Sequence, residues 1–324
     1  MTLSIERVPL EAVAGELEAH RECTLFHTAP WLEFLSRTQD AEPVIGVVTR
    51  GEERVGFFVG AIVSRFGIRI LGSPFPGWTT AWMGFALDEG IDRWEAAEAL
   101  RELAFGDLGC WHLELRDRRL PAPAETPARW RYTEPDLYEL DLTATEEEIF
   151  GRMSSACRRA VRKGEKSGVI VEQASGEDFA DEYYEQLLDV FAKQSLKPTY
   201  EVGRVRELIR ALEPAGAVVL LRARSAEGAS IATGIFPGGH GYAYFWGGAS
   251  WREHQGLRPN EAIFWRAMRE WKSRGADVLE MGGGGDYKER YGPEHLTVPL
   301  FGRSRVRGLS TLRDVAERIK RRGY

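Results

Sequence analysis

Hydrophobic and polar positions along residues 43–74 form three apolar runs that two polar turns separate. The runs "PVIGVVTR", "VGFFVGAIVSR" and "IRILGSP" have the length of strands, and the turns between them contain Gly51 and Gly67. Such runs joined by short glycine turns are typical of an antiparallel meander. Residues 92–105 then show the apolar spacing of a helix, and the run "CWHLEL" follows. This half therefore predicts three antiparallel strands, a helix and a further strand.

The same order of elements returns about 170 residues later. Residues 217–250 contain three apolar runs with a polar turn at Gly228 and a glycine-rich turn before "GYAYFW". A helix predicted over residues 260–275, begun by Pro259 or Asn260, leads to the run "ADVLEM". Its apolar face consists of Ile263, Phe264, Ala267, Met268 and Trp271. We interpret the chain as a duplicated α/β (α+β) fold, each domain a mixed, mostly antiparallel sheet flanked by helices.

The two copies meet near "ELDLTATEEEIF". Thr145 and Glu148 have the spacing of a capping box at the start of a helix there. We therefore predict an N-terminal domain of residues 1–144 and a C-terminal domain of residues 145–324.

The composition is that of a soluble globular protein, with 43% hydrophobic and 28% charged residues. No run reaches the ~20 apolar residues that span a bilayer, and the start lacks the basic and apolar regions of a signal peptide. We therefore expect a cytoplasmic protein. Its three cysteines, Cys23, Cys110 and Cys157, form no CxxC pair, so neither a metal site nor a disulfide framework is expected.

The net charge of -6 argues against a protein covered by nucleic acid, but the charge is unevenly distributed. Residues 1–145 hold 14 Lys+Arg and 24 Asp+Glu, and no lysine precedes Lys163. Basic residues are in excess in the remainder of the chain. The second half is therefore the better host for an anionic ligand.

Several segments carry motifs that together resemble a known family. They are the basic helix "SSACRRAVRKGEKSGV" (154–169), the segment 244–284, "YKERYG" (287–292) and, more weakly, "LFHTAPWLEFL" (25–35) with Phe26, Pro30 and Trp31. In this order they resemble the FemAB-like branch of the GNAT acyltransferase superfamily, which includes Fem-type peptidyltransferases and BioF2-like acetyltransferase domains. The resemblance spans nearly the whole chain. It implies two tandem GNAT folds forming a cleft, and transfer of an acyl or aminoacyl group to an amine.

The family pattern and this chain differ at the donor site. The usual GNAT pyrophosphate loop, Q/R-x-x-G-x-G/A, would fall within "REHQGLRPN". Arg258 stands there in place of the last small residue, and Pro259 removes a backbone N–H group. This departure argues against a standard acyl-CoA site in this half. The resemblance implies no tightly bound cofactor, with acyl-CoA as the default co-substrate and aminoacyl-tRNA as the close rival.

The glycine run in "GGGGDYKERYG" (282–292) is a candidate site. It is not a Walker loop, which needs GxxxxGK followed by Ser or Thr. Consecutive glycines let a ligand or another chain approach closely. We interpret the run as the lip of the acceptor site, with Lys288 aimed inward to hold an anion or to stabilise an oxyanion. The alternative is a flexible loop whose lysine is solvated.

Transfer to an amine also needs a base, and the candidates are Glu280, Asp286 and His254. Glu280 stands on a strand beside the glycines, where desolvation would raise its carboxyl pKa, unless it is a surface residue. Asp286 could instead bond to its own turn, and His254 could be a solvated loop residue. The predicted catalytic residues are Lys288, Glu280 and Asp286.

Substrate contacts are predicted for Tyr244, Trp246, Arg258, Asn260, Gly283, Gly284, Tyr287 and Arg159. Tyr242, Tyr244 and Trp246 alternate along one strand, where they line a groove or pack in the core. Arg159 belongs to the basic helix of residues 152–166. This helix and the basic C-terminal stretch "GRSRVRGLSTLRDVAERIKRRGY" suggest contact with phosphate of a tRNA, a nucleotide-linked sugar or a lipid headgroup. The C-terminal stretch could rest on an anionic membrane or pack on its own domain through Leu309, Leu312, Val315 and Ile319.

The leading hypothesis is an N-acyltransferase that moves an acetyl or aminoacyl group to a small-molecule or precursor amine by direct attack. The chain has no GxSxG elbow that would indicate a covalent intermediate. An aminoacyl-tRNA-dependent peptidyltransferase acting on a cell-wall or peptide precursor is the alternative. A non-catalytic protein that binds polysaccharide or lipid precursors is a second class. A nucleic-acid-binding module is a third, which the overall acidity disfavours.

Overall fold

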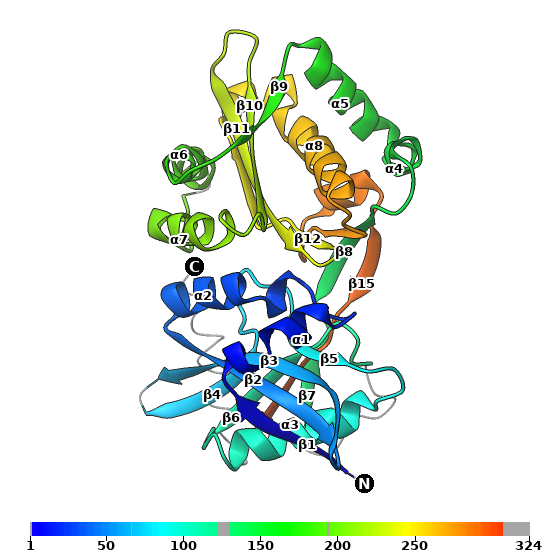
Figure 1. Ribbon diagram of the computed structural model, residues 1–324. Helices are drawn as coiled ribbons and strands as arrows, with labels where there is room; N and C mark the ends of the chain where they lie inside the picture. Colours follow the sequence, from blue (N-terminus) through cyan, green and yellow to red (C-terminus); the bar gives the residue numbers. More distant parts are fainter. Residues whose placement is uncertain (1, 66, 122–129, 193–194, 307–324) are drawn as a thin grey trace. The chain divides into compact units, whose positions relative to one another are not determined.

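The computed structural model describes residues 2–65, 67–121, 130–192 and 195–306 of the chain. The chain divides into two compact units. Unit 1 combines Met1–Pro135 with Thr297–Tyr324, and unit 2 is the intervening segment Asp136–Leu296. Each unit has a mixed sheet of eight strands. Helices pack against each sheet (Figure 1).

The sheet of unit 1 has the strand order β1-β2-β3-β4-β6-β16-β7, and β5 pairs with β3. β4 and β6 run parallel, and the other neighbouring strands are antiparallel. The strands are β1 (Leu3–Val8), β2 (Ala41–Arg50), β3 (Glu53–Arg65), β4 (Ile68–Ser73), β5 (Gly84–Leu87), β6 (His112–Arg116), β7 (Arg131–Thr133) and β16 (Leu300–Ser304).

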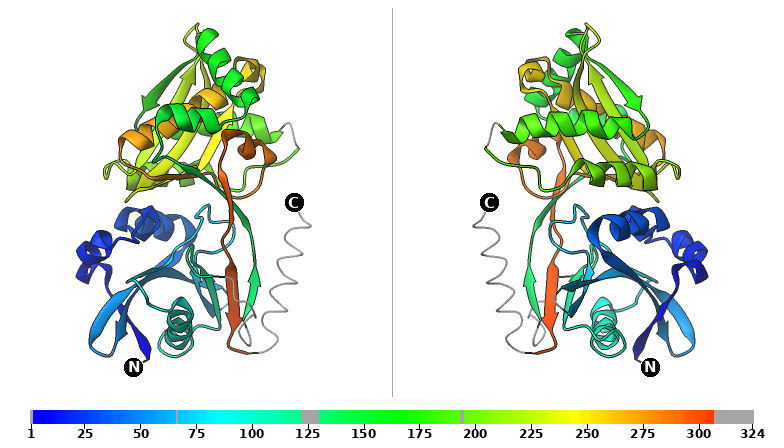
Figure 2. Two further views of the ribbon diagram at one scale, coloured as in Figure 1. Left: turned by 90° about the vertical axis from the view of Figure 1, so that its right-hand side faces the viewer. Right: turned by 90° about the vertical axis from the view of Figure 1, so that its left-hand side faces the viewer.

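Helices cover both faces of this sheet (Figure 2). On one face, α3 (Arg93–Phe105) packs against β1 and β6. The helix begins where the Asp92 carboxylate accepts hydrogen bonds from the amides of Trp94 and Glu95, as an N-cap does. The core beneath it includes Phe58, Leu100, Leu103, Leu113 and Phe301. The segment before β2 forms η1 (Leu10–Ala12), α1 (Ala14–Ala19), η2 (Leu25–His27) and α2 (Ala29–Gln39), and α2 packs on β2.

The sheet of unit 2 has the strand order β9-β10-β11-β12-β14-β8-β15, and β13 pairs with β11. β12 and β14 run parallel. The strands are β8 (Asp136–Asp141), β9 (Ile170–Ala174), β10 (Val218–Arg224), β11 (Ser230–Gly239), β12 (Tyr242–Tyr244), β13 (Gly247–Ser250), β14 (Val278–Glu280) and β15 (Glu294–Thr297).

Two helix layers enclose the sheet of unit 2 (Figure 2). α6 (Asp178–Ala192) and α7 (Val202–Leu212) lie on one face, where α6 contacts β11 and β13. α8 (Pro259–Ser273) lies on the other face against β10 and β11, and α5 (Ser155–Lys166) packs on α8. The core on this side includes Phe236, Ile263, Phe264, Met268 and Trp271. The shorter helices are α4 (Glu146–Arg152), η3 (Arg252–Leu257) and η4 (Asp286–Tyr291).

The two sheets have the same strand order, position by position. β1, β2, β3, β4 and β6 correspond in order to β9, β10, β11, β12 and β14, and the parallel pair named above falls at the same place in each sheet. α3 and α8 occupy the same connection, between the meander and the parallel strand. The predicted fold, with a mostly antiparallel sheet flanked by helices in each copy, is therefore confirmed. The capping box at Thr145 and Glu148 and the start of α8 at Pro259 are confirmed as well.

The division into units differs from the predicted boundary after residue 144. β8 precedes that boundary but pairs with β14 in unit 2. β16 belongs to the predicted C-terminal domain but pairs with β6 and β7 in unit 1. Ladder hydrogen bonds to distant strands decide which sheet a segment joins, whereas a capping box records only where a helix begins.

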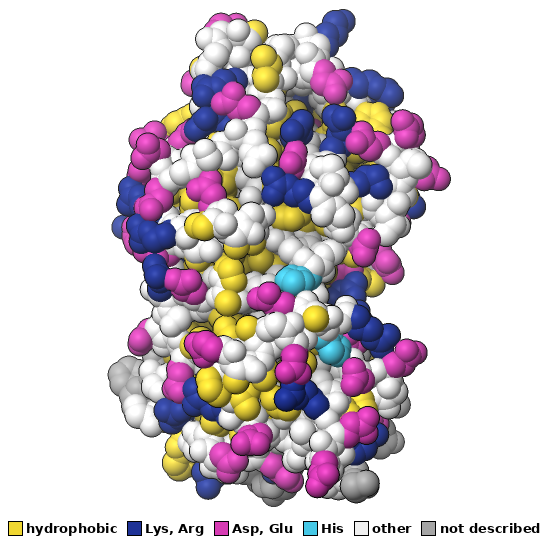
Figure 3. Space-filling model, in the orientation of Figure 1, with side chains coloured by type: hydrophobic (Ala, Val, Ile, Leu, Met, Phe, Trp, Pro, Cys, Tyr) yellow, Lys and Arg dark blue, Asp and Glu magenta, His cyan; other side chains and the backbone are white. Residues whose placement is uncertain are grey.

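Unit 1 has a surface groove of about 720 Å³ between η1, α2 and β2. Apolar side chains line it, and Figure 3 shows hydrophobic side chains gathered on this face of unit 1. Two arginines of the groove form ion pairs, Arg7 with Glu42 and Arg37 with Glu33. These pairs compensate the charge of both arginines. The lining also includes Val8, Leu10, Leu32, Ser36 and Ile45.

Candidate functional site

The sheet of unit 2 opens where β12 and β14 part. The two strands pair from Tyr242, opposite Val278, to Tyr244, opposite Glu280. The amide of Phe245 then donates to the carbonyl of Glu280 (2.7 Å), and the chain beyond Phe245 continues as β13 along β11. After Glu280 the chain turns instead into the glycine loop (residues 281–285) and then into η4. A gap therefore remains beside β13 that no strand of the sheet fills among the described residues.

This gap is a cavity of about 240 Å³ within unit 2. Its floor is aromatic, because the ring of Phe264 lies 4.6 Å from that of Phe245 and 4.8 Å from that of Tyr291. Apolar walls with a few polar groups are typical of small-molecule sites. The lining residues are Thr233, Gly234, Phe245, Gly248, Ala249, Ser250, Asn260, Ile263, Phe264, Tyr287, Arg290 and Tyr291.

The polar end of the cavity lies at the start of α8. Arg258 precedes the helix with a φ of 63°, a conformation that glycine adopts more readily, which explains why a small residue is expected there. The buried carboxylate of Glu261 lies 3.3 Å from Arg290 and 3.8 Å from Arg258. Asn260 donates a hydrogen bond to the Ser250 hydroxyl (3.2 Å). A helix start favours anionic or oxygen-rich groups, so this end suits the polar part of a ligand.

Glycine is required along the glycine loop for two reasons. The φ angles of Gly282, Gly284 and Gly285 are 74°, 68° and 88°, which L side chains rarely adopt. Gly283 has no room for a side chain, because a Cβ atom there would lie 2.4 Å from the carbonyl oxygen of Asp136. The loop is therefore a fixed turn against β8.

This loop encloses the ammonium group of Lys288. The residue is only 6% exposed, and its Nζ donates to the carbonyl of Gly283 (2.9 Å). Burial lowers the pKa of Lys288, and the carboxylate of Glu280 acts in the opposite direction. The alternative of a solvated lysine is therefore wrong, and Lys288 is a largely desolvated cation.

Glu280 belongs to a buried acidic pair. It stands opposite Glu139 in the β14–β8 ladder, and both side chains are buried. The Tyr242 hydroxyl lies 2.7 Å from Glu280 Oε2 and 3.2 Å from Glu139 Oε1. A hydroxyl has one proton to donate, so at any moment it serves only one of these carboxylates. Two close carboxylates favour a proton or a cation beside them.

Tyr244 and Trp246 are both buried, as packed residues are. Trp246 lies beyond the end of β12, and its ring is 5.0 Å from that of Tyr200. The guanidinium of Arg204 lies 6.0 Å from the centre of the Trp246 ring, and burial lowers the pKa of Arg204. Tyr242, Tyr244 and Trp246 therefore pack in the core and do not line an open groove.

Of the predicted site residues, Asn260 and Tyr287 line the cavity, whereas Lys288, Glu280, Arg258, Tyr244 and Trp246 do not. Asp286, Gly283 and Gly284 are exposed. His254 lies in η3 beside Glu253 (3.5 Å), and Arg159 is exposed on α5. Among the described residues that line the cavity, none of these five is included. The C-terminal stretch with Leu309, Leu312, Val315 and Ile319 lies outside the described residues.

Several residues of the site could not be identified from a sequence motif. Thr233 and Ser250 reach the cavity from the paired strands β11 and β13, and Glu139 meets Glu280 only through the β8–β14 ladder. Arg290 and Tyr291 stand within "YKERYG", so that motif is the signal that could have identified them.

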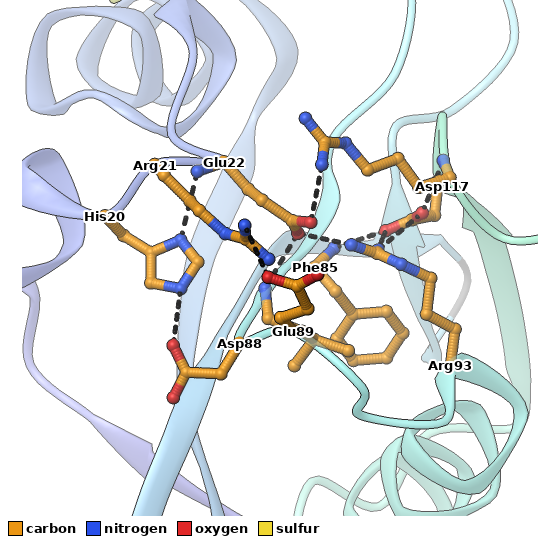
Figure 4. Close-up of polar contacts among 10 residues, drawn as sticks. His20, Arg21, Glu22, Phe85, Asp88, Glu89, Arg93 and Asp117 are labelled. Carbon is orange, nitrogen blue, oxygen red and sulfur yellow. Dashed lines mark hydrogen bonds and ion pairs between the residues drawn. The ribbon is translucent and has the colours of Figure 1, made fainter.

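The equivalent place in unit 1 is closed by buried charges (Figure 4). The Asp117 carboxylate accepts the amide of Phe85 (2.7 Å) and pairs with Arg93 (2.8 Å). Arg93, in the first turn of α3, also pairs with Glu22, to which Arg119 donates as well (2.7 Å). The protein's own side chains thus take the place that the cavity has in unit 2.

Residues 151–291 match the family model described as acetyltransferase (GNAT) domain. The matched segment includes α5, α8, the residues that line the cavity and Lys288. Glu139 precedes it. No curated protein matches the sequence.

Solved structures with the same fold extend over almost the whole chain. A crystal structure of FemX has a TM-score of 0.73 at 12% sequence identity and covers 92% of this chain and 96% of its own. The structure of L-PGS from Bacillus licheniformis has a TM-score of 0.53 at 12% identity, with coverages of 88% and 94%. A tandem GNAT protein from the clavulanic acid biosynthesis pathway has a TM-score of 0.53 at 15% identity, with coverages of 93% and 98%. At these identities the likeness shows a shared fold.

The described residues include neither a membrane-spanning helix nor a metal cluster. No helix among them has the length and apolar character of a transmembrane segment. No group of three or more His, Cys, Asp or Glu side chains among them is placed to hold a metal ion.

Proposed function

We propose that this chain, which belongs to the GNAT superfamily of acyltransferases and has the tandem fold of FemAB-like proteins, moves an acetyl or aminoacyl group to an amine. The observation that carries the proposal is the opening of the sheet at Glu280. It leaves a cavity beside a strand edge, within the residues that match the family model. The acyl donor binds in this cavity, and the new amide bond forms at the strand end.

The cavity offers separate contacts to the two parts of such a donor. The edge of β13 that faces away from β11 can bond an extended, amide-bearing arm, as free strand edges do. Phe245 and Phe264 give apolar contact along it. The start of α8, with Arg258, favours a phosphate or another anionic group. GNAT domains use acyl-CoA as co-substrate, and CoA has both an amide-bearing arm and phosphates.

Lys288 and the acidic pair supply the charges that amide formation needs. Negative charge develops on the carbonyl oxygen as the amine attacks, and a buried ammonium stabilises it more strongly than a solvated one. Glu280, with Glu139, is the candidate base that takes the first proton of the ammonium. The C–N bond forms, the bond from the acyl carbon to the donor's sulfur or oxygen breaks, and the second proton leaves with that atom.

Direct attack, without a cysteine intermediate, agrees with the environment of the thiols. Burial raises the pKa of Cys23 to about 12 and that of Cys157 to about 11. Burial also raises the pKa of Cys110. Thiols of this kind are almost wholly protonated at neutral pH, and the thiolate is the nucleophile. We therefore expect no acyl group on cysteine during turnover.

Filling the cavity tests where the donor binds. Asn260→Trp places an indole in the polar end of the cavity, so we expect donor affinity to fall at least tenfold because donor and indole compete for the same volume. Isothermal titration with acetyl-CoA, and with 3′-alanylamino-3′-deoxyadenosine as a stable aminoacyl analogue, measures the change. Ser36→Trp, in the groove of unit 1, is the control and is expected to leave affinity unchanged. Equal affinity in Asn260→Trp and wild type would place the donor elsewhere.

Aminoacyl-tRNA is the second candidate donor, and one observation on α5 favours it. Arg159, Lys163 and Lys166 are exposed, and no carboxylate of the described residues forms an ion pair with them. Arginines on neighbouring elements are paired, such as Arg152 with Asp141 (2.8 Å) and Arg269 with Glu146 (2.7 Å). Cations that the protein leaves uncompensated are suited to a phosphate backbone.

Charge reversal on α5 distinguishes the two donors. If tRNA is the donor, Lys163→Glu/Lys166→Glu is expected to weaken tRNA binding at least tenfold and to lower the slope of log affinity against log salt by about 2. Affinity for acetyl-CoA should not change. Arg206→Glu/Arg210→Glu on α7 is the matched control, since both arginines are paired with carboxylates. Binding of tRNA that is unaffected by the α5 variant would remove this donor surface.

A further inference from the structure

Two hydrogen-bond donors beside the cavity of unit 2 have no acceptor among the described residues. They are the Tyr291 hydroxyl and Nε of Arg290, both of which are buried atoms. The two residues are adjacent in η4, and both line the cavity. The Tyr291 side chain is fully buried.

The surroundings of the Tyr291 hydroxyl do not satisfy it. The ring lies 4.8 Å from that of Phe264, and the guanidinium carbon of Arg290 lies 5.4 Å from the Tyr291 ring centre. The hydroxyl has no hydrogen-bond partner among the described residues. The terminal nitrogen of Arg290 is directed to Glu261 (3.3 Å), which leaves Nε free. Burial raises the pKa of Tyr291 far above its ordinary range, so the hydroxyl remains protonated and can donate.

A buried donor without an acceptor costs stability, and proteins seldom keep one unless it has a role. Tyr183 shows the ordinary solution in the same unit. It is as deeply buried as Tyr291, but its hydroxyl bonds to that of Tyr200 (2.7 Å). Two adjacent unsatisfied donors on one cavity are explained if a ligand supplies the acceptor.

We propose that the bound acyl donor places an acceptor oxygen against the Tyr291 hydroxyl and Nε of Arg290. The oxygen belongs to an amide or ester carbonyl, or to a phosphate, of the donor molecule. A hydrocarbon segment cannot accept either hydrogen bond, so this part of the cavity suits a polar segment of the donor molecule and not an alkyl chain. This inference rests on the proposed function, because it assigns a contact to the donor in the same cavity.

Tyr291→Phe tests the inference, since it removes one unsatisfied oxygen and keeps the ring. We expect the variant to melt no lower than wild type, because no internal hydrogen bond is lost. Its affinity for whichever of acetyl-CoA and 3′-alanylamino-3′-deoxyadenosine the wild type binds should fall at least tenfold. Tyr183→Phe is the matched control, with a lower melting temperature and unchanged affinity. Pantetheine and ADP as separate probes distinguish a carbonyl acceptor from a phosphate acceptor.

The outcomes separate this inference from the proposed function. If wild type and Tyr291→Phe bind the donor equally, or if Tyr291→Phe melts as low as Tyr183→Phe, the inference is overturned while the donor site remains. If wild type binds neither donor probe, the proposed function fails and the inference fails with it.

Discussion

Replacing Lys288 with methionine is expected to lower kcat/KM for amide formation by about 100-fold, the effect of losing one oxyanion-stabilising group. Methionine keeps most of the volume and removes the charge that we propose stabilises the developing oxyanion. Since burial lowers the pKa of Lys288, the folded state gains little from its charge, and the variant should melt no lower than wild type. Initial rates with the accepted donor, together with thermal unfolding followed by circular dichroism, measure both effects.

Lys272→Met is the matched control for Lys288→Met. The Lys272 ammonium also bonds a backbone carbonyl of unit 2, that of Leu142 (2.8 Å), but it lies on α8 away from the glycine loop. We expect its activity to stay within threefold of wild type. Lys288→Met with near-normal kcat/KM, or Lys272→Met with an equal loss, would remove Lys288 from the chemistry.

Arg93→Met is expected to destabilise unit 1 by about 3–5 kcal/mol, because it leaves two buried carboxylates without their main cation. The Arg93 side chain is 10% exposed, and its partners Asp117 and Glu22 are 1% and 7% exposed. Urea unfolding followed by tryptophan fluorescence measures the loss. Arg21→Met removes an exposed pair with Glu89 and should cost almost nothing. Equal midpoints for the two variants would contradict this role of Arg93.

The loss of stability in Arg93→Met should depend on pH and become smaller as the pH falls. Burial acts to raise the pKa of Glu22. The hydrogen bond from the Leu87 amide and the charges of Arg93 and Arg119 outweigh this effect, so the pKa of Glu22 is lowered. The stabilisation from Glu22 is therefore complete above its unfolded pKa, about 4.3, and is lost as the pH falls through the lowered folded value. In Arg93→Met much of this lowering disappears, so the stability gap to wild type should narrow below about pH 4.

The duplicated order of elements could be predicted from the sequence because each element depends on local patterns. Apolar alternation defined the meanders, and Pro259 and the Thr145–Glu148 capping box gave the starts of α8 and α4. The membership of β8 and β16 could not be predicted in this way. It depends on ladders with β14 and β6, which lie more than 100 residues away in the chain.

The candidate site also has a part that the sequence could predict and a part that it could not. The glycine run and Lys288 stand together in the sequence, and the structure keeps them together. The cavity instead requires β13 to follow β11 while the chain after Glu280 turns away, and no single segment records this. The closed counterpart in unit 1 depends on Asp117 meeting Arg93 across the strand end, a contact that composition cannot show.

We propose that unit 2 transfers an acyl group from a donor held where its sheet opens. The decisive experiment incubates the purified chain with labelled acetyl-CoA, or with tRNA charged with a labelled amino acid, and a panel of primary amines. We expect label in a new amide from at least one donor, and a large loss of that label with Asn260→Trp. Transfer from neither donor, or equal transfer by wild type and Asn260→Trp, would contradict it.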